Sequence, residues 1–242
     1  MKFEHLFRLA CAFAVLSQLA GSVAGQTADD TKPAADQPKT WIFLTKGRAT
    51  DGIERSAIEK MQAAHIANFV RLAGIGKLLT AGPMADPQKI LRGIVVVTVT
   101  GQTELAEIFE PDPYVKQGFM SVEASPMKIQ LGSINTKLDS ESLEEFRIAV
   151  FNKTNSATAE PDSETAVANN AYCKSIYDDE RLRFFATLDD ENSTRRGILI
   201  FKTLDEGAVK ELAGDLPTVK NGQWKLNIFP LYLTTGTLDA AK

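Results

Sequence analysis

An internal repeat is the feature that most restricts the fold of this chain. Residues 111–118 read PDPYVKQG, and 104 positions later residues 215–222 read DLPTVKNG. The same offset continues over a long stretch, because it matches Arg92-Gly93-Ile94 with Arg196-Gly197-Ile198 and Pro126 with Pro230. Scattered coincidences do not keep one register in this way. The sequence therefore predicts two copies of one structural unit.

Upstream of residues 86–91, the alignment of the two copies uses an offset of 105. It places Trp41-Ile42-Phe43 against Phe146-Arg147-Ile148 and Ala81 against Ala186. This change of offset predicts that the second copy has lost one residue from the loop that corresponds to 86–91.

Each copy shows the same order of expected elements, β-α-β-β-α-β. Apolar residues recur at spacings of three and four through 53–73, which indicates one face of a helix, and Gly74 and Gly76 indicate its end. The nearly continuous Val/Ile run at 94–99 is typical of a strand buried on both faces. The expected elements of the first copy lie at 41–45, 53–73, 77–81, 94–99, 104–109 and 119–131. Those of the second lie at 148–151, 162–178, 182–186, 198–202, 206–213 and 224–233.

This order predicts an α+β fold. Two helices on one face of a four-stranded sheet form a ferredoxin-like sandwich, which leaves the other face of the sheet uncovered. We therefore expect two tandem ferredoxin-like (βαββαβ) repeats, at 41–131 and 145–238, with a linker at 132–144. They are expected to pack sheet to sheet as an intramolecular pseudo-dimer.

The first forty residues have a different character. Lys2 and Arg8 come before an apolar run at 9–16, and Ser22-Val23-Ala24 supplies the small residues that a signal peptidase accepts. The apolar run is too short to span a bilayer, and residues 25–40 contain almost nothing apolar. The sequence predicts a cleaved signal peptide at 1–24, a disordered leader at 25–40, and export to the periplasm or the extracellular space without membrane attachment.

Charge and residue counts exclude several classes of function. The formal net charge is −4, and removal of the signal, with two basic residues and one acidic residue, makes it −5. An acidic chain without a basic cluster has no electrostatic basis for binding nucleic acid. After signal removal one histidine and Cys173 remain, too few for the common zinc sites, and Cys173 is expected to be a buried structural residue. No P-loop, G-x-G-x-x-G or G-x-S-x-G motif occurs, so we expect neither metal nor cofactor.

The segments HIANFVRLAGIGKLLTAGPM (65–84) and EPDPYVKQGFMSVEASPMK (110–128) resemble the YciI-like (YCII-related) family. The resemblance covers 41–131 and rests on a helix histidine, a G-x-L-x-x-A-G-P strand, a D-P-Y…G segment and a proline in the last strand. It implies a dimeric α/β-barrel fold and a His–Asp pair beside the sheet, which falls on His65 and Asp112. For some members it implies acid–base elimination on small ring compounds with loss of halide.

The second copy lacks this pair in the sequence alignment, which places Asn170 at the position of His65 and Leu216 at that of Asp112. Both copies keep an arginine before the buried strand, Arg92 in the first copy and Arg196 in the second. Because the copy without the pair keeps its arginine, we expect both arginines to be structural anchors.

The candidate site residues each have two interpretations. His65 is either a core residue with one satisfied hydrogen bond or a general acid–base, with Asp112 fixing its tautomer and its second ring nitrogen facing the substrate. Asp112 is either that partner or the cap of a short helical turn that begins at Pro113; one carboxylate can do both. Tyr114 either donates to a ligand or packs.

The predicted function is the binding of a small cyclic or carbonyl-bearing molecule, with elimination or isomerisation at His65 and Asp112 as the reaction that the resemblance implies. The alternative is a non-catalytic module that binds a ligand or a protein.

Overall fold

The computed structural model describes residues 37–138, 140, 142–154 and 160–238. The predicted signal peptide and most of the predicted leader lie outside these residues. The first strand begins at Lys39, two residues before the expected start of the first repeat. Within the described part of the chain, no helix is long and apolar enough to cross a membrane.

The described elements follow the expected order in each half, with one short helix added. The first half contains β1 (Lys39–Lys46), α2 (Arg55–Gly74), β2 (Leu78–Pro83), β3 (Leu91–Val97), α3 (Gln102–Phe109), α4 (Pro113–Lys116) and β4 (Met120–Leu131). The second half contains β5 (Leu143–Lys153), α5 (Ser163–Asp178), β6 (Leu182–Leu188), β7 (Arg195–Phe201), α6 (Glu206–Gly214), α7 (Pro217–Lys220) and β8 (Trp224–Thr234). Gly82 and Pro83 were expected to follow the second strand. They are instead the last two residues of β2 and pair with β3.

The eight strands form one curled antiparallel sheet in the order β2-β3-β1-β4-β6-β7-β5-β8. The first four and the last four strands thus have the same internal order. The halves are joined where β4 pairs with β6, from Met127 opposite Leu188 to Leu131 opposite Phe185. At the other edge, β8 meets the end of β2 through a bridge between Met84 and Leu231. The predicted α+β class is confirmed.

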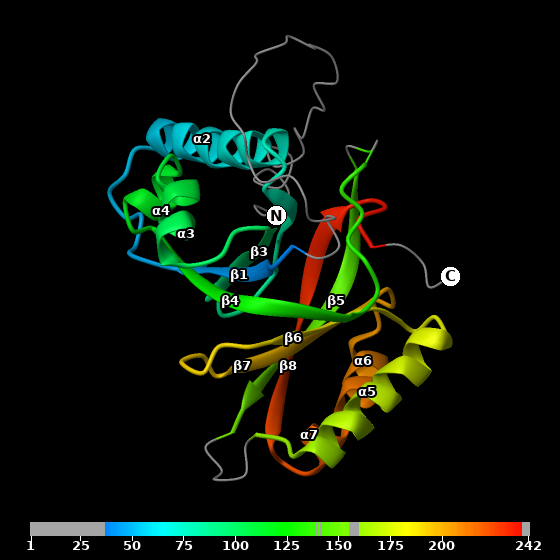
Figure 1. The fold of residues 1–242 in the computed structure, drawn as a ribbon. Helices are drawn as coiled ribbons and strands as arrows, with labels where there is room; N and C mark the ends of the chain where they lie inside the picture. The colour runs from blue at the N-terminus through cyan, green and yellow to red at the C-terminus, as the bar shows by residue number, and fades with distance from the viewer. Residues whose placement is uncertain (1–36, 139, 141, 155–159, 239–242) are drawn as a thin grey trace.

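The helices lie on the outside of the curled sheet, with α2, α3 and α4 on one side and α5, α6 and α7 on the other (Figure 1). The inner sheet faces of both halves meet in one core, which includes Trp41, Phe43, Phe146, Phe184 and Leu231. A separate apolar layer lies between the helices and the outer sheet face of each half. The uncovered sheet faces expected from the sequence therefore bury each other.

Strand pairing corrects the sequence alignment of the two halves. Leu44 pairs with Gly93, and Phe151 pairs with Gly197, so the first strands are offset by 107 residues (44 to 151) while their partners are offset by 104 (93 to 197). The pairs Pro83–Gly93 and Thr187–Gly197 both keep the offset of 104. No residue has been lost from the loop between the second and third strands; instead, the second half has three fewer residues between equivalent positions of its first strand and its long helix, since Leu44 to His65 spans 21 positions and Phe151 to Asn169 spans 18.

Gly82 allows the β2 and β8 strands to meet. A Cβ atom at this position would lie 2.0 Å from the carbonyl oxygen of Tyr232 and 2.8 Å from the side chain of Leu233. The equivalent residue in the second half is Ala186, which is fully buried where β6 pairs with β4. The glycine of the A-G-P segment therefore allows the backbone of β2 in the first half to lie close to the backbone of β8 in the second half.

We predict that Gly82→Ala destabilises the protein by about 1–3 kcal/mol, because the methyl group forces the backbone of β8 to move. The free energy of unfolding in urea measures the effect. Gly74→Ala is the matched control, since a Cβ atom there meets nothing within 4 Å. Equal destabilisation, or none, in the two variants would contradict this account of the seam.

Candidate functional site

His65 lies on the buried face of α2. The buried residues of this helix recur at helical spacing and are Met61, His65, Asn68, Phe69 and Leu72. Asn68 and Arg71 both donate to the carbonyl oxygen of Ile108, at 3.0 and 3.1 Å, and tie α2 to α3. The helix face that holds His65 is thus fixed both by packing and by hydrogen bonds.

Asp112 is the N-terminal cap of α4. Its Oδ1 accepts hydrogen bonds from the backbone N–H groups of Tyr114, at 3.0 Å, and Val115, at 3.4 Å, and Pro113 occupies the first helical position. Gly118 ends this turn with φ = 73°, a value that favours glycine. The recurring P-x-V-K-x-G pattern is therefore a short capped helix followed by a left-handed residue, and the capping interpretation of Asp112 is correct.

The second oxygen of Asp112 contacts His65. The Nδ1 atom of His65 lies 2.6 Å from Oδ2 of Asp112, and the two residues are 6% and 0% exposed. An ionised carboxylate has no proton to donate, so Nδ1 carries the shared proton. The neutral ring then presents Nε2 as its proton acceptor, and Nε2 has no hydrogen-bond partner among the described residues. One carboxylate caps α4 and fixes the tautomer of the histidine.

Tyr114 packs against the histidine. Its ring meets the ring of His65 edge to face, with centroids 5.5 Å apart, and Phe69 contacts the imidazole in the same manner at 4.5 Å. Burial, together with the Asp112 charge, raises the pKa of Tyr114. Its hydroxyl reaches the carbonyl oxygen of Ile58 at 3.5 Å. The side chain helps to hold the imidazole in place and does not belong to the wall of the cavity described next.

A cavity of about 230 Å³ lies between α2 and the sheet, and His65 is in its wall while Asp112 and Tyr114 are not. Pockets for drug-sized ligands occupy roughly 300–1,000 Å³, so this one suits a smaller molecule. Most of the wall is apolar, with polar side chains at a few places. Two residues of the second half, Leu143 and Thr234, complete it.

The second half replaces the His–Asp pair with an amide. Asn169 is the structural equivalent of His65, because the buried residues that follow it, Cys173 and Ile176, correspond to Phe69 and Leu72. The sequence alignment named Asn170 instead, and that assignment was wrong. Asn169 accepts from the backbone N–H of Thr218, at 3.2 Å, and donates to its hydroxyl, also at 3.2 Å. Leu216 occupies the cap position without a side-chain cap.

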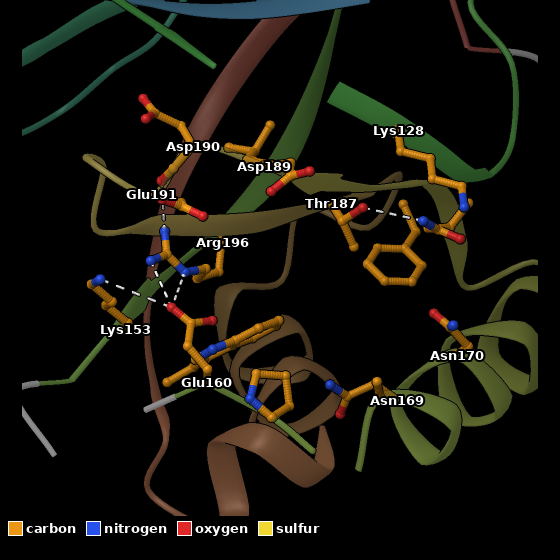
Figure 2. Close-up of a pocket in the computed structure, with 16 residues that line it drawn as sticks. Lys128, Lys153, Glu160, Asn169, Asn170, Thr187, Asp189, Asp190, Glu191 and Arg196 are labelled. Carbon is orange, nitrogen blue, oxygen red and sulfur yellow. Dashed lines mark hydrogen bonds and ion pairs between the residues drawn. The ribbon is translucent and has the colours of Figure 1, made fainter. Parts of the chain in front are cut away.

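The equivalent depression of the second half is larger, about 720 Å³, and several charged side chains line it (Figure 2). There Arg196 is bound on every side: it donates to Glu160 at 2.7 Å and to the carbonyl oxygens of Asp190, Ser193 and Arg195. Figure 2 shows Glu160 lying between Arg196 and Lys153. The prediction of a structural anchor is correct for this arginine.

Arg92, the equivalent arginine of the first half, behaves differently. It is exposed, it lines the cavity beside His65, and the described residues offer it neither a hydrogen bond nor an ion pair. The prediction that it anchors the structure was wrong. Among the residues that the structure describes, no acid stands beside Arg92 as Glu160 stands beside Arg196, and the sequence repeat did not reveal this difference.

Other chemistries find no support in the described residues. They contain no group of three or more His, Cys, Asp or Glu side chains arranged to hold a metal ion. Cys173 is completely buried in the apolar layer beneath α5, and burial raises the pKa of its thiol to about 12. A thiol in that state is a packing residue and not a nucleophile.

One segment of the chain matches the model of a known protein family. Residues 41–128 match the model of the YCII-related domain. A search among curated proteins found no significant match. Solved structures of similar fold include a protein of Fusobacterium nucleatum proposed to be a monooxygenase, with a TM-score of 0.52, 9% identity and coverage of 85% of this chain and 98% of that one.

Two further structures are similar. A protein proposed to be a chlorite dismutase has a TM-score of 0.52 and 9% identity, with coverage of 84% and 96%. A protein of Lactobacillus acidophilus, also proposed to be a monooxygenase, has a TM-score of 0.50 and 12% identity, with coverage of 86% and 100%. At these identities the likeness concerns the fold, a curled antiparallel α/β barrel, and not the activity.

We predict that Asp112→Asn moves the proton of the neutral His65 ring from Nδ1 to Nε2. The asparagine oxygen can still cap α4, so its NH₂ group faces Nδ1, which must then accept. Long-range ¹⁵N–¹H correlation spectra distinguish the two tautomers, and His65→Gln identifies the signal. Asp86→Asn serves as a control away from the pair. An unchanged tautomer in Asp112→Asn would show that the carboxylate does not orient this ring.

Proposed function

Because residues 41–128 match the model of the YCII-related domain, we propose that the cavity at His65 binds a small molecule and that His65 transfers a proton to or from it. The observation that carries the proposal is the 2.6 Å contact between Nδ1 of His65 and Oδ2 of Asp112 at the cavity wall. It leaves Nε2 as the basic atom of the ring and holds the ring in one orientation.

The reaction class that fits this arrangement is proton abstraction from a carbon next to a carbonyl group. Nε2 takes the proton, and the electron pair of the C–H bond becomes part of a new double bond. In an elimination, a leaving group on the adjacent carbon departs with its bonding pair, and the imidazolium then releases its proton to water. In an isomerisation, the imidazolium returns the proton to a different carbon. Asp112 stabilises the imidazolium in both cases.

We also propose that the two halves arose by duplication and act as an intramolecular pseudo-dimer. Their identical strand orders support this, and so do the equivalent turns in which Pro113 and Pro217 begin a short helix and Gly118 and Gly222 have φ values of 73° and 70°. In this view the proton-transferring pair belongs to the first half alone. The second half supplies a wall of the cavity and half of the barrel core.

The export of the protein remains a proposal that rests on the apolar run and the small residues of the first 24 positions. It bears on the substrate, because an exported protein meets molecules outside the cytoplasm.

We predict that His65→Gln reduces turnover by a factor of about 10²–10⁴, the usual contribution of one general acid–base. The assay follows a library of small ring and carbonyl compounds in D₂O by NMR and scores deuterium incorporation at carbon or loss of a leaving group. Asn170→Ala, an exposed position in the pocket of the second half, is expected to retain wild-type rates. Compounds that bind in the cavity without any turnover dependent on His65 would identify the protein as a non-catalytic ligand-binding module.

A further inference from the structure

We propose that the ligand of this cavity is a small organic acid whose carboxylate is bound by Arg92, an inference that rests on the proposed function of the cavity and specifies its substrate class. The acid is oriented by the arginine on one side and faces the imidazole of His65 on the other. Arg92 is thus a specificity-determining residue that the family's His–Asp pair does not include.

The first argument is that the charge of Arg92 is not used within the part of the protein that the structure describes. Arg92 leaves the sheet from β3 at the cavity wall and makes no hydrogen bond or ion pair with a described residue. Asp86 is close enough for the Arg92 charge to contribute to lowering its pKa. Both oxygens of Asp86 are already engaged, however, by the backbone N–H groups of Gln88, Ile90 and Leu91.

The second half provides an internal comparison. The equivalent Arg196 has the same position on its strand, but Glu160 neutralises it, and three backbone carbonyl oxygens occupy its remaining donors. Figure 2 shows the guanidinium of Arg196 turned to Glu160. Equivalent positions of the two halves thus hold arginines with different partners. Arg196 is bound by groups of the protein, whereas Arg92 makes no hydrogen bond or ion pair with a described residue.

The third argument comes from the rest of the cavity wall. Leu44, Phe69, Ile94 and Met120 make it largely apolar, so a bound molecule has an apolar body. A guanidinium at one side of an apolar cavity matches a carboxylate in geometry and charge, because two parallel N–H groups can donate to its two oxygens.

The size of the cavity connects binding with chemistry. With about 230 Å³ available, an acid bound at Arg92 is confined beside the imidazole of His65, which lines the same cavity. The carbon next to the carboxylate, or next to a carbonyl group in the same small molecule, is then the site from which the proton is taken. Thr234 of the second half adds a hydroxyl to the wall, so the site is incomplete without that half.

The test uses matched pairs of small compounds, each a carboxylic acid and its primary amide, in ligand-observed NMR with the full-length protein. Dissociation constants are then measured for the pairs that bind. Wild type is expected to prefer acids by about tenfold or more, as a charge-assisted pair requires. Arg92→Gln is expected to abolish the preference, while Lys60→Gln, which removes an exposed charge of α2 outside the cavity, is expected to retain it.

The outcomes separate this inference from the proposed reaction. Equal binding of acids and amides by wild type, an acid preference that survives in Arg92→Gln, or no acid binding at millimolar concentrations would each overturn it. In His65→Gln the acid preference is expected to remain even though turnover is lost. Arg92-dependent acid binding without turnover would support this inference and contradict the catalytic proposal. His65-dependent turnover of neutral compounds alone would support the catalytic proposal and contradict this inference.

Discussion

The structure depends on the burial of two sheet faces that no helix covers. Each half places its helices on one face of four strands, and the other face carries large side chains such as Trp41, Phe43, Phe146 and Phe184. These side chains need a partner surface, because apolar area exposed to water costs about 25 cal/mol per Å². Curling the eight strands into one sheet lets the two faces bury each other. The cavity at His65 lies at the edge of this arrangement, where β5 and β8 come next to the first half.

The two halves show that the link between the long helix and the short capped helix can be made in more than one way. In the first half a buried carboxylate both caps α4 and holds a histidine; in the second, Asn169 reaches across to the backbone and hydroxyl of Thr218. The amide completes the link with neutral groups and without a titratable side chain. A His–Asp pair is therefore more than this fold needs for stability, which favours a chemical role for it in the half that keeps it.

Sequence patterns were sufficient for the order of elements and insufficient for their register. The Val/Ile run and the helical stripe identified β3 and α2, and the cap at Asp112 followed from the residue types of a D-P turn. The alignment of β1 with β5 failed because a shift of two residues along a strand leaves the same side chains facing inward. Trp41 therefore matched Phe146 as well as its true equivalent, Ile148, since all three lie in the barrel core. In the helix, the two neighbouring asparagines Asn169 and Asn170 were equally good matches to His65, and the sequence could not decide between them.

The role of Arg92 could not be predicted from the sequence, because it depends on residues that the fold brings near. Whether an arginine is an anchor or a free cation depends on an acid brought near by the fold, and Glu160 lies in the segment between β5 and α5 that differs in length between the halves. The repeat aligned the two arginines correctly and suggested one role for both. It contained no information on the third residue that separates their roles.

The two seams of the barrel differ in a way that a pair of identical chains would not permit. A twofold dimer has to use the same contacts twice, whereas here β4 and β6 pair over several residues and β2 and β8 meet through the Met84–Leu231 bridge and a hydrogen bond from Ala85 to Pro230. Under the proposed duplication, fusion released the halves from that symmetry. One seam became a continuous ladder that holds the halves together, and the shorter seam, with Gly82 and Pro83 on one side and Thr234 on the other, became part of the cavity wall. The same release would explain why the His–Asp pair occurs in the first half alone. Under the proposed function, a single chain needs only one reactive cavity, and its other half can specialise in closing that cavity.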